Sequence, residues 1–581
     1  MKPVVPFGDL LVENFASGKS SGTGAQTTAA SAMAWCGQHG GEVKGSDMVR
    51  RISALGTGGQ YAGNIERDFH TLLRHMNKRL GATITTVRAR MYNHGLGRVE
   101  YQDLPVLWPD EFAKAIYKYD PTVFHHMMMG SMSEEDAVEY WEHCSNHCAW
   151  FRAHPSHQYP RKGRLIPLSL YGDEVQCYRN SEVGSVACIA WTTDFGYGHE
   201  SLLRYYPICC YSEHCASEDT YDDVMSELAP RLTLMVDMDF VHEWSSSGYA
   251  FMLSSIQGDL KWVHAHYGLH NYRRNNFCSF CGCLKVHPDP TMTISDFRLS
   301  AQHINTPSDL SEFHDRASPI FTVPGATIGR VQHDCMHSQL LGTEKIANGS
   351  AIVYLVERSF WNGFQAQGGD YADAMDEALR IAHKDFLHWK RQNSLDVTQP
   401  RFSCARLSRR NRQSYACLSS KAAPSKAVTL WIATRSVEFA LLPTASEMDK
   451  QVAGCLHSYA AALKLMDESP LVLSQEQADF FHTNIMAHLQ LFAQLNKSSR
   501  EIRGRMPGRN LWMIIPKAHH LMHFASVVQV ECLNPKAWSL FMAEDFIGRI
   551  SRIARVCHRS SVSMRTLERY LALILLAIQR I

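Results

Sequence analysis

Two metal-binding half-sites lie far apart in this sequence of 581 residues. The first is Cys278-Ser-Phe-Cys281, whose spacing lets one turn offer two thiolates to a tetrahedral Zn²⁺. The second is His519 with His523, which share one face of a helix because they are four residues apart. Each pair supplies only two of the four ligands that a structural zinc ion requires. Together they predict one structural zinc, and therefore a fold that brings distant parts of the chain together.

Each half-site also has other interpretations. A Cys-x-x-Cys pair can be redox-active, but the preceding residues 271–276 do not offer the strand–helix context of a thioredoxin-like motif. Cys283 could replace either thiolate, and His520 could pair with His523 in place of His519. The histidines could also be buried or capping residues without a metal. The orphan cysteine pair favours zinc.

The composition is that of a globular protein, with 45% hydrophobic and 20% charged residues over a length of roughly four domains. The 58 Lys and Arg nearly balance the 57 Asp and Glu, which argues against a uniformly basic nucleic-acid coat protein but allows local basic patches. No signal-peptide pattern opens the sequence, and no apolar run approaches the ~20 residues that span a bilayer. We therefore expect an intracellular protein without a membrane segment, in which the 17 cysteines serve metal sites or the core.

Hydrophobic periodicity predicts a mixed α/β fold interrupted by helices. Three β-rich runs are expected within 164–211, then a helix over 217–240 and an apolar segment ending near 256. Helices are expected over 352–364, 371–389, 427–442, 448–466, 476–495, 516–524 and 543–557. The predicted division is an α-rich N-terminal region of uncertain role at 1–155 (flexible at 19–32), a first core part at 156–295, a helical insertion at 296–505, and a closing part at 506–581.

Three acidic residues stand where a pair of Mg²⁺ or Mn²⁺ ions would need them. Asp173 and Asp259 each follow an apolar, strand-like run and a glycine, and Glu544 opens a predicted helix. Carboxylates at strand ends and on one helix are what a two-metal site requires. Any one of these acids could be a solvated or capping residue, and Asp194 and Asp545 are competitors for Asp173 and Glu544. The order of acids, cysteines, histidines and final acid is the informative feature.

Two further groups carry weaker signals. Asp334 and His337 could form a carboxylate–imidazole pair, although the spacing alone favours a helix cap. Arg549, Arg552 and Arg555 recur every third residue just beyond Glu544, and such a stripe could follow the phosphates of DNA. An ordinary solvated helix face is the alternative for the arginines.

The order of these residues resembles that of the cut-and-paste transposases of the CACTA type, which are themselves similar to the recombination-activating recombinase. The phrases that carry the likeness lie within about 160–560 and are IPLSLYGD, QGDLKW, HDCMHSQLLG, SSKAAPSKA, PKAHHLMH and AEDFIGRISRIAR. The resemblance implies an RNase H-like core with the catalytic triad Asp173, Asp259 and Glu544. It also implies a helical insertion, containing Asp334 and His337, whose two ends are tied by zinc beside the active site.

The expected function is therefore that of a nuclear, transposase-like protein that binds DNA, hydrolyses phosphodiesters with Mg²⁺ and transfers strands. A homodimer is the family expectation, because two DNA ends must be held together. The alternative is an inactive, domesticated transposase that serves as a zinc-stabilised scaffold for DNA or protein. A metalloenzyme unrelated to nucleic acid would need an open zinc position, which four protein ligands deny.

Overall fold

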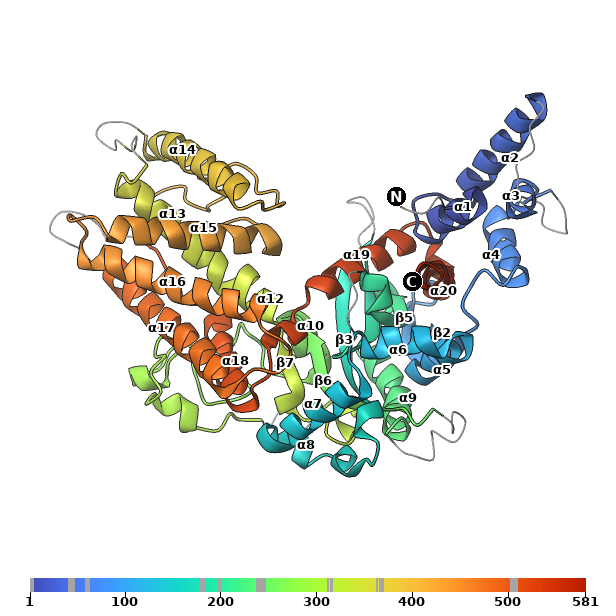
Figure 1. The fold of residues 1–581 in the computed structure, drawn as a ribbon, viewed down its shortest axis with the longest axis horizontal. Helices are drawn as coiled ribbons and strands as arrows, with labels where there is room; N and C mark the ends of the chain where they lie inside the picture. The colour runs from blue at the N-terminus through green and yellow to red at the C-terminus, as the bar shows by residue number, and fades with distance from the viewer. Residues whose placement is uncertain are drawn as a thin grey trace.

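The centre of the protein is a five-stranded mixed sheet with the strand order β5-β4-β3-β6-β7 (Figure 1). The computed structural model describes residues 5–39, 47–57, 63–177, 184–196, 200–236, 247–310, 313, 317–361, 364, 370–501 and 510–581. The strands are β3 (Leu165–Gln176), β4 (Ser185–Thr193), β5 (Tyr206–Ser212), β6 (Ala250–Gly258) and β7 (Val331–His333). Strand β4 runs antiparallel to both of its neighbours, whereas β3, β6 and β7 are parallel to one another. The mixed α/β class expected from the sequence is confirmed.

Helices and further chain cover this sheet, so its central strands are buried on both faces and mostly apolar. Strand β6 is buried along its whole length, and β3 is buried from Leu165 to Gly172. Continuous apolar runs are typical of strands covered on both sides. The helices that contact the sheet are α9 (Thr220–Leu234), α10 (Leu260–Tyr267), α19 (Phe541–Ala554) and α20 (Val562–Ile578).

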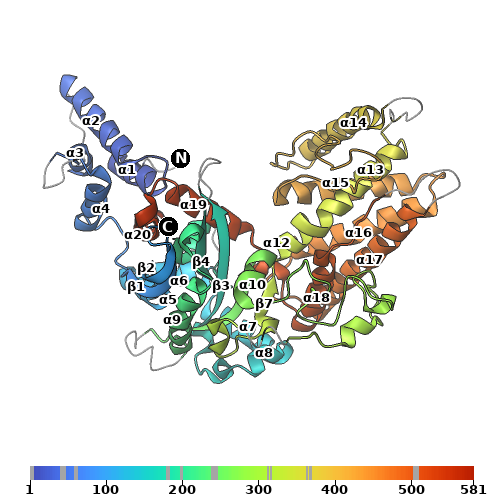
Figure 2. The same ribbon diagram turned by 180° about the vertical axis from the view of Figure 1, so that it is seen from behind.

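A second, helical part stands beside the sheet and has its own hydrophobic core (Figures 1 and 2). Its helices are α13 (Glu344–Glu357), α14 (Tyr371–Gln392), α15 (Ala422–Ala440), α16 (Glu447–Glu468) and α17 (Gln475–Arg500). Helix α18 (Pro516–Glu531) packs on α17 and leads the chain back towards the sheet. The helices expected here are confirmed, except that the one placed at 352–364 begins at Glu344 and ends at Glu357.

The predicted start of the helical insertion is too early. Residues 296–310 and 317–330 are irregular with short 3₁₀ turns, and the chain then adds β7 to the sheet. Asp334 directly follows β7, and His337 lies in the short helix α12 (Cys335–Ser338). Both residues therefore stand at the sheet and not within the insertion. A three-residue strand is too short to produce a recognisable sequence pattern.

The segment 19–32 is not a flexible linker, because most of it belongs to helix α2 (Gly22–Gln38). The Ser21 hydroxyl caps this helix by accepting the Gly24 N–H at 3.0 Å. The other N-terminal elements are α1 (Phe7–Ala16), α3 (Asp47–Ser53), α4 (Ile65–His75), the hairpin β1 (Thr85–Asn93) and β2 (Arg98–Val106), α5 (Pro109–Tyr119), α6 (Pro121–Met129), α7 (Glu134–His147) and α8 (Ala149–Arg152). Alanine, threonine and serine make a helix without a strong apolar face, which explains the wrong prediction.

The N-terminal helices share one hydrophobic core with the sheet and with α20. Arg569 of α20 donates hydrogen bonds to the Phe15 carbonyl and to the Glu66 carboxylate. The first and last helices of the chain therefore stabilise one another. No helix in the described ranges is long and apolar enough to cross a bilayer.

Candidate acidic site and metal centre

Two glycine–aspartate pairs lie side by side where the parallel pairing of β3 with β6 ends. Gly172 of β3 and Gly258 of β6 are register partners, so Asp173, which is still within β3, and Asp259, which follows β6, lie at the same end of the paired segment. Asp259 also caps α10, because its carboxylate accepts the Trp262 N–H at 2.7 Å. The Trp262 ring lies against both glycines: a Cβ at Gly172 would come within 2.1 Å of the ring, and one at Gly258 within 2.8 Å.

We expect Gly172→Ala to destabilise the part of strand β3 that carries Asp173. The new methyl group would meet a fully buried indole ring, so strand or ring must move, at a cost of about 1–3 kcal/mol in unfolding free energy. Gly548→Ala is the matched control, since its Cβ meets nothing within 4 Å in a helix, where alanine is favoured by about 1 kcal/mol. Denaturant unfolding of both variants measures the difference. Equal stability of the two would show that Trp262 does not require the glycine.

Glu544, in the first turn of α19, shares an electrostatic environment with these two aspartates. Burial, together with the charges of Asp259 and Glu544, raises the pKa of Asp173 to about 7. Burial also raises the pKa of Glu544; His337 opposes this shift, and Asp259 is among the acids that add to it. The three predicted residues are thus brought to one region. Among the described residues, only cysteine and histidine groups place three ligand atoms within 4.8 Å of one another, so the three acids do not form so compact a group.

Asp334 and His337 complete this region, and both interpretations of the pair are correct. The Asp334 carboxylate caps α12 by accepting the N–H groups of Met336 and His337 at 2.9 and 2.8 Å, and it also bonds the His337 ring. The other ring nitrogen of His337 lies 3.5 Å from Glu544. Burial lowers the pKa of His337, but Asp334 and Glu544 outweigh it and raise the pKa. The imidazole therefore connects Asp334 to Glu544.

Lys517 is a neighbour of the acids that its sequence position does not reveal. It lies in the first turn of α18, where burial lowers its pKa and the charges of Asp334 and Asp259 oppose that shift. A lysine beside a helical histidine pair carries no distinctive signal in sequence. Its position near the acids depends on how α18 packs against α12.

The two competing aspartates have their own local partners. Asp194 follows β4 at the opposite end of β3 from Asp173, and it accepts hydrogen bonds from Ser169 at 2.5 Å and Ser254 at 2.7 Å. Asp545 accepts from the Ser201 hydroxyl at 2.5 Å and pairs with Arg549 at 2.9 Å. These contacts explain both residues without a metal.

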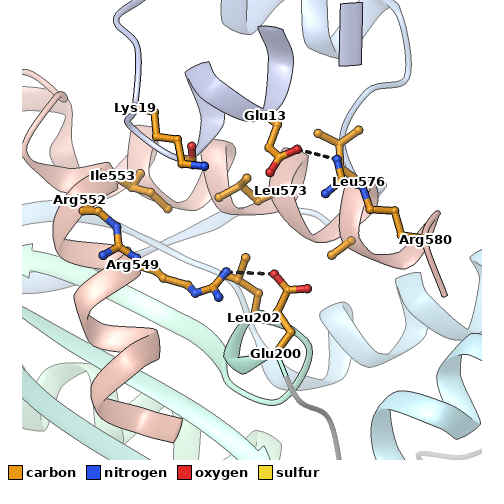
Figure 3. A pocket seen from close by; sticks show the side chains of 12 residues that line it. Glu13, Lys19, Glu200, Leu202, Arg549, Arg552, Ile553, Leu573, Leu576 and Arg580 are labelled. Atoms are coloured by element: carbon orange, nitrogen blue, oxygen red, sulfur yellow. Dashed lines mark hydrogen bonds and ion pairs between the residues drawn. The ribbon is translucent and has the colours of Figure 1, made fainter. Parts of the chain in front are cut away.

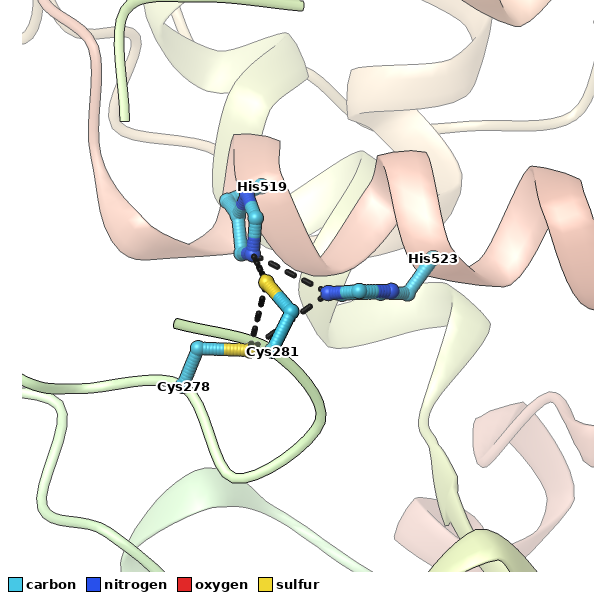
Figure 4. A group of neighbouring side chains, drawn as sticks. All are labelled: Cys278, Cys281, His519 and His523. Carbon is cyan, nitrogen blue, oxygen red and sulfur yellow. Dashed lines mark hydrogen bonds between the residues drawn. The ribbon is translucent and has the colours of Figure 1, made fainter. Parts of the chain in front are cut away.

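The four predicted zinc ligands converge (Figure 4). The two sulfurs are 3.8 Å apart, and the two Nε2 atoms of the histidines are 3.0 Å apart. The sulfur–nitrogen distances are 3.3 Å from Cys281 to His519 and 3.4 Å from Cys278 to His523. A zinc tetrahedron with ordinary bond lengths has edges of roughly 3.8 Å between sulfurs and 3.3 Å between nitrogens. The donor set and its dimensions therefore fit a structural Zn²⁺.

The alternative ligands lie around this group. The His520 ring packs on Phe277 at 5.8 Å and does not join the four. Cys283 and His303 form a second group with His519. His303 Nδ1 is 3.8 Å from the Cys281 sulfur, while its Nε2 bonds the Asp296 carbonyl at 2.9 Å. Residues that orient metal ligands commonly stand in such positions. His303 was missed because a single histidine in an irregular segment has no ligand spacing.

The predicted arginine stripe on α19 is not uniform. Arg549 is paired with Glu200 at 3.0 Å as well as with Asp545, and Arg555 donates to the Gln176 carbonyl at 3.1 Å. Arg552 has neither kind of contact within the described part of the chain and faces a pocket beside α20. The three arginines therefore differ in their availability to a ligand.

A scan against protein-family models finds none that matches this chain, and no curated protein matches it.

Proposed function

We propose that the chain is a DNA-processing protein of transposase type with an RNase H-like core. The observation that carries the proposal is the proximity of Asp173 in β3, Asp259 directly after β6 and Glu544 in α19, which share one electrostatic environment where the β3–β6 pairing ends. The mixed sheet and the helical part between β7 and α18 support the same architecture. DNA as partner, a dimer that holds two DNA ends, and a nuclear site of action belong to this proposal.

The acids have the donor chemistry for divalent metal. Asp173, Asp259 and Glu544 would hold Mg²⁺ or Mn²⁺, because hard cations prefer carboxylate oxygens and would offset both the burial and the repulsion that raise the pKa of Asp173. When bound, a pair of such ions supplies an activated nucleophile and stabilises the leaving oxygen of a phosphodiester. His337 is hydrogen-bonded to Asp334 and stands 3.5 Å from Glu544, and the Lys517 ammonium offsets part of the negative charge.

The zinc ligands would position this site and take no part in the chemistry. Cys278 and Cys281 belong to the segment that follows α10, whereas His519 and His523 lie on α18. Their joint ligation would clamp α18 to that segment, and α18 leads directly towards α19 and Glu544. Four protein ligands close the coordination sphere, so the arrangement supports a structural role.

Nicking of supercoiled plasmid DNA by the full-length protein tests the proposal. In Mg²⁺ or Mn²⁺ we expect Asp259→Ala and Glu544→Gln to lower the nicking rate by about 100-fold or more, since each removes a metal ligand. Asp545→Asn is the matched control, because Asp545 is adjacent to Glu544 but faces Ser201 and Arg549. Wild-type protein that nicks with neither metal would overturn the catalytic proposal and favour the zinc-stabilised scaffold.

A further inference from the structure

A pocket of about 380 Å³ lies between the end of α1, the second half of α19 and α20 (Figure 3). Its charged walls come from segments far apart in sequence and are Glu13, Lys19, Glu200, Arg549, Arg552 and Arg580. Leucines such as Leu573 and Leu576 form its apolar part. The pocket is therefore a product of the tertiary fold and not of one helix face.

Two of its cations are already neutralised. Arg580 pairs with Glu13 at 2.5 Å, and Arg549 pairs with Glu200 at 3.0 Å. Within the described part of the chain, neither the Lys19 ammonium nor the Arg552 guanidinium has a hydrogen bond or ion pair. The pocket thus holds two cations without a direct hydrogen bond or ion pair among the described residues, although the charge of Arg552 helps to lower the pKa of Asp545.

The backbone holds Lys19 next to α19. Gly18 has a φ of +73°, and a Cβ at this position would come within 2.4 Å of the Arg552 carbonyl oxygen. Only glycine combines this left-handed conformation with so close an approach. The turn after α1 therefore brings Lys19 to the part of α19 that carries Arg552.

We propose that this pocket binds a phosphate group, supplied by a nucleic-acid strand or by a small phosphate ester. Two cations match the charge of a phosphate monoester and are sufficient for the single charge of a strand phosphodiester, and a guanidinium presents paired N–H donors to the phosphate oxygens. The leucine walls reduce the local dielectric and so strengthen the attraction.

The position on α19 indicates how a strand could reach the pocket. Arg552 stands two turns beyond Glu544, and a helix rises 1.5 Å per residue, so the two lie about 12 Å apart along the axis. A strand with one phosphate at the acidic site could place another in the pocket. This strand source rests on the proposed function, whereas phosphate binding itself does not.

Ligand binding to the full-length protein is measured in EDTA, so that binding by the pocket is observed without metal-dependent chemistry. The contact with EDTA is kept brief so that the protein retains its zinc. A fluorescein-labelled 20-base-pair duplex reports strand binding by anisotropy across a salt series, and dAMP and inorganic phosphate report small-ligand binding by calorimetry. The test variant is Lys19→Ala/Arg552→Ala. Lys450→Ala, at an exposed position of α16, is the control for loss of a surface cation.

We expect the double variant to lower the magnitude of the slope of log K against log salt by about 1, the value for one phosphate, and to weaken duplex binding by about tenfold at low salt. Arg552→Lys should keep the slope, because the charge remains. If the double variant weakens binding of the duplex alone, the phosphate bound by the pocket comes from a nucleic-acid strand. If it also weakens binding of dAMP or inorganic phosphate, the pocket accepts a small phosphate ester. A double variant that melts like wild type and binds all three probes equally well would overturn the proposal.

The two proposals fail separately. The loss of binding caused by Lys19→Ala/Arg552→Ala in EDTA should persist in an Asp259→Ala background, because Asp259 does not line the pocket. Absent nicking with an intact pocket effect would remove only the catalytic proposal. Unchanged binding in the double variant would remove only the pocket.

Discussion

Cys278→Ser should remove the bound zinc and strongly destabilise the protein. The substitution replaces one of two thiolates in a group whose sulfurs are 3.8 Å apart, and serine is a poor zinc ligand. Structural zinc contributes on the order of 10 kcal/mol to the folding of small domains, whereas a whole domain is stable by only about 5–15 kcal/mol. We expect wild type to carry about one zinc per chain and the variant to carry almost none, with a large fall in melting temperature.

Metal analysis of the purified protein and thermal melts with and without a chelator measure this effect. Chelated wild type should melt like Cys278→Ser, because both lack the clamp between the cysteine segment and α18. Cys283→Ser is the control, since Cys283 lies beside the four ligands but outside their group. Equal zinc loss in Cys283→Ser would transfer the ligand assignment to Cys283, and zinc-free wild-type protein would contradict the site itself.

Asp173→Asn should stabilise the metal-free protein at pH 8. Burial and the neighbouring acids raise the pKa of Asp173 from 3.8 to about 7, so between these values the folded state binds more protons than the unfolded state. The contribution of Asp173 to the free energy of unfolding is fully present below pH 3.8 and is lost as the pH rises through about 7 and the carboxyl group ionises. Asparagine cannot ionise and escapes that loss. We expect a gain of several degrees in melting temperature at pH 8 that disappears towards pH 4.

Melting temperatures from pH 4 to pH 8 in EDTA give the measurement. Asp545→Asn should behave in the opposite sense, because Ser201 and Arg549 lower the pKa of Asp545 against the effect of burial. Added Mg²⁺ should raise the melting temperature of wild type at pH 8 more than that of Asp173→Asn. Parallel pH curves for wild type and Asp173→Asn would show that the carboxylates do not repel one another in the folded protein.

The zinc ligands and the three acids could be proposed from sequence because their geometry is largely local. A Cys-x-x-Cys turn and an i, i+4 histidine pair each place two donors on one side of a short segment, whatever the remainder of the chain does. The glycine–aspartate pairs after strand-like runs likewise indicated strand ends, which is correct for β6, whereas β3 continues past Asp173 to Gln176. By contrast, the segment 19–32 was misjudged because its helix depends on an N-cap and on intrinsic propensity more than on an apolar stripe.

The choice between candidates was left to the tertiary structure. Glu544 and Asp545 are adjacent, and on a helix they point about 100° apart, so only the packing of α19 decides which one faces Asp173. No sequence pattern predicts the roles of His303 and Lys517 or the presence of the three-residue strand β7. The pocket of Lys19 and Arg552 joins residues from opposite ends of the chain. Sequence by itself determined the short-range donor pairs, because backbone geometry sets their spacing; long-range packing alone decided which of them meet and which charges remain unpaired.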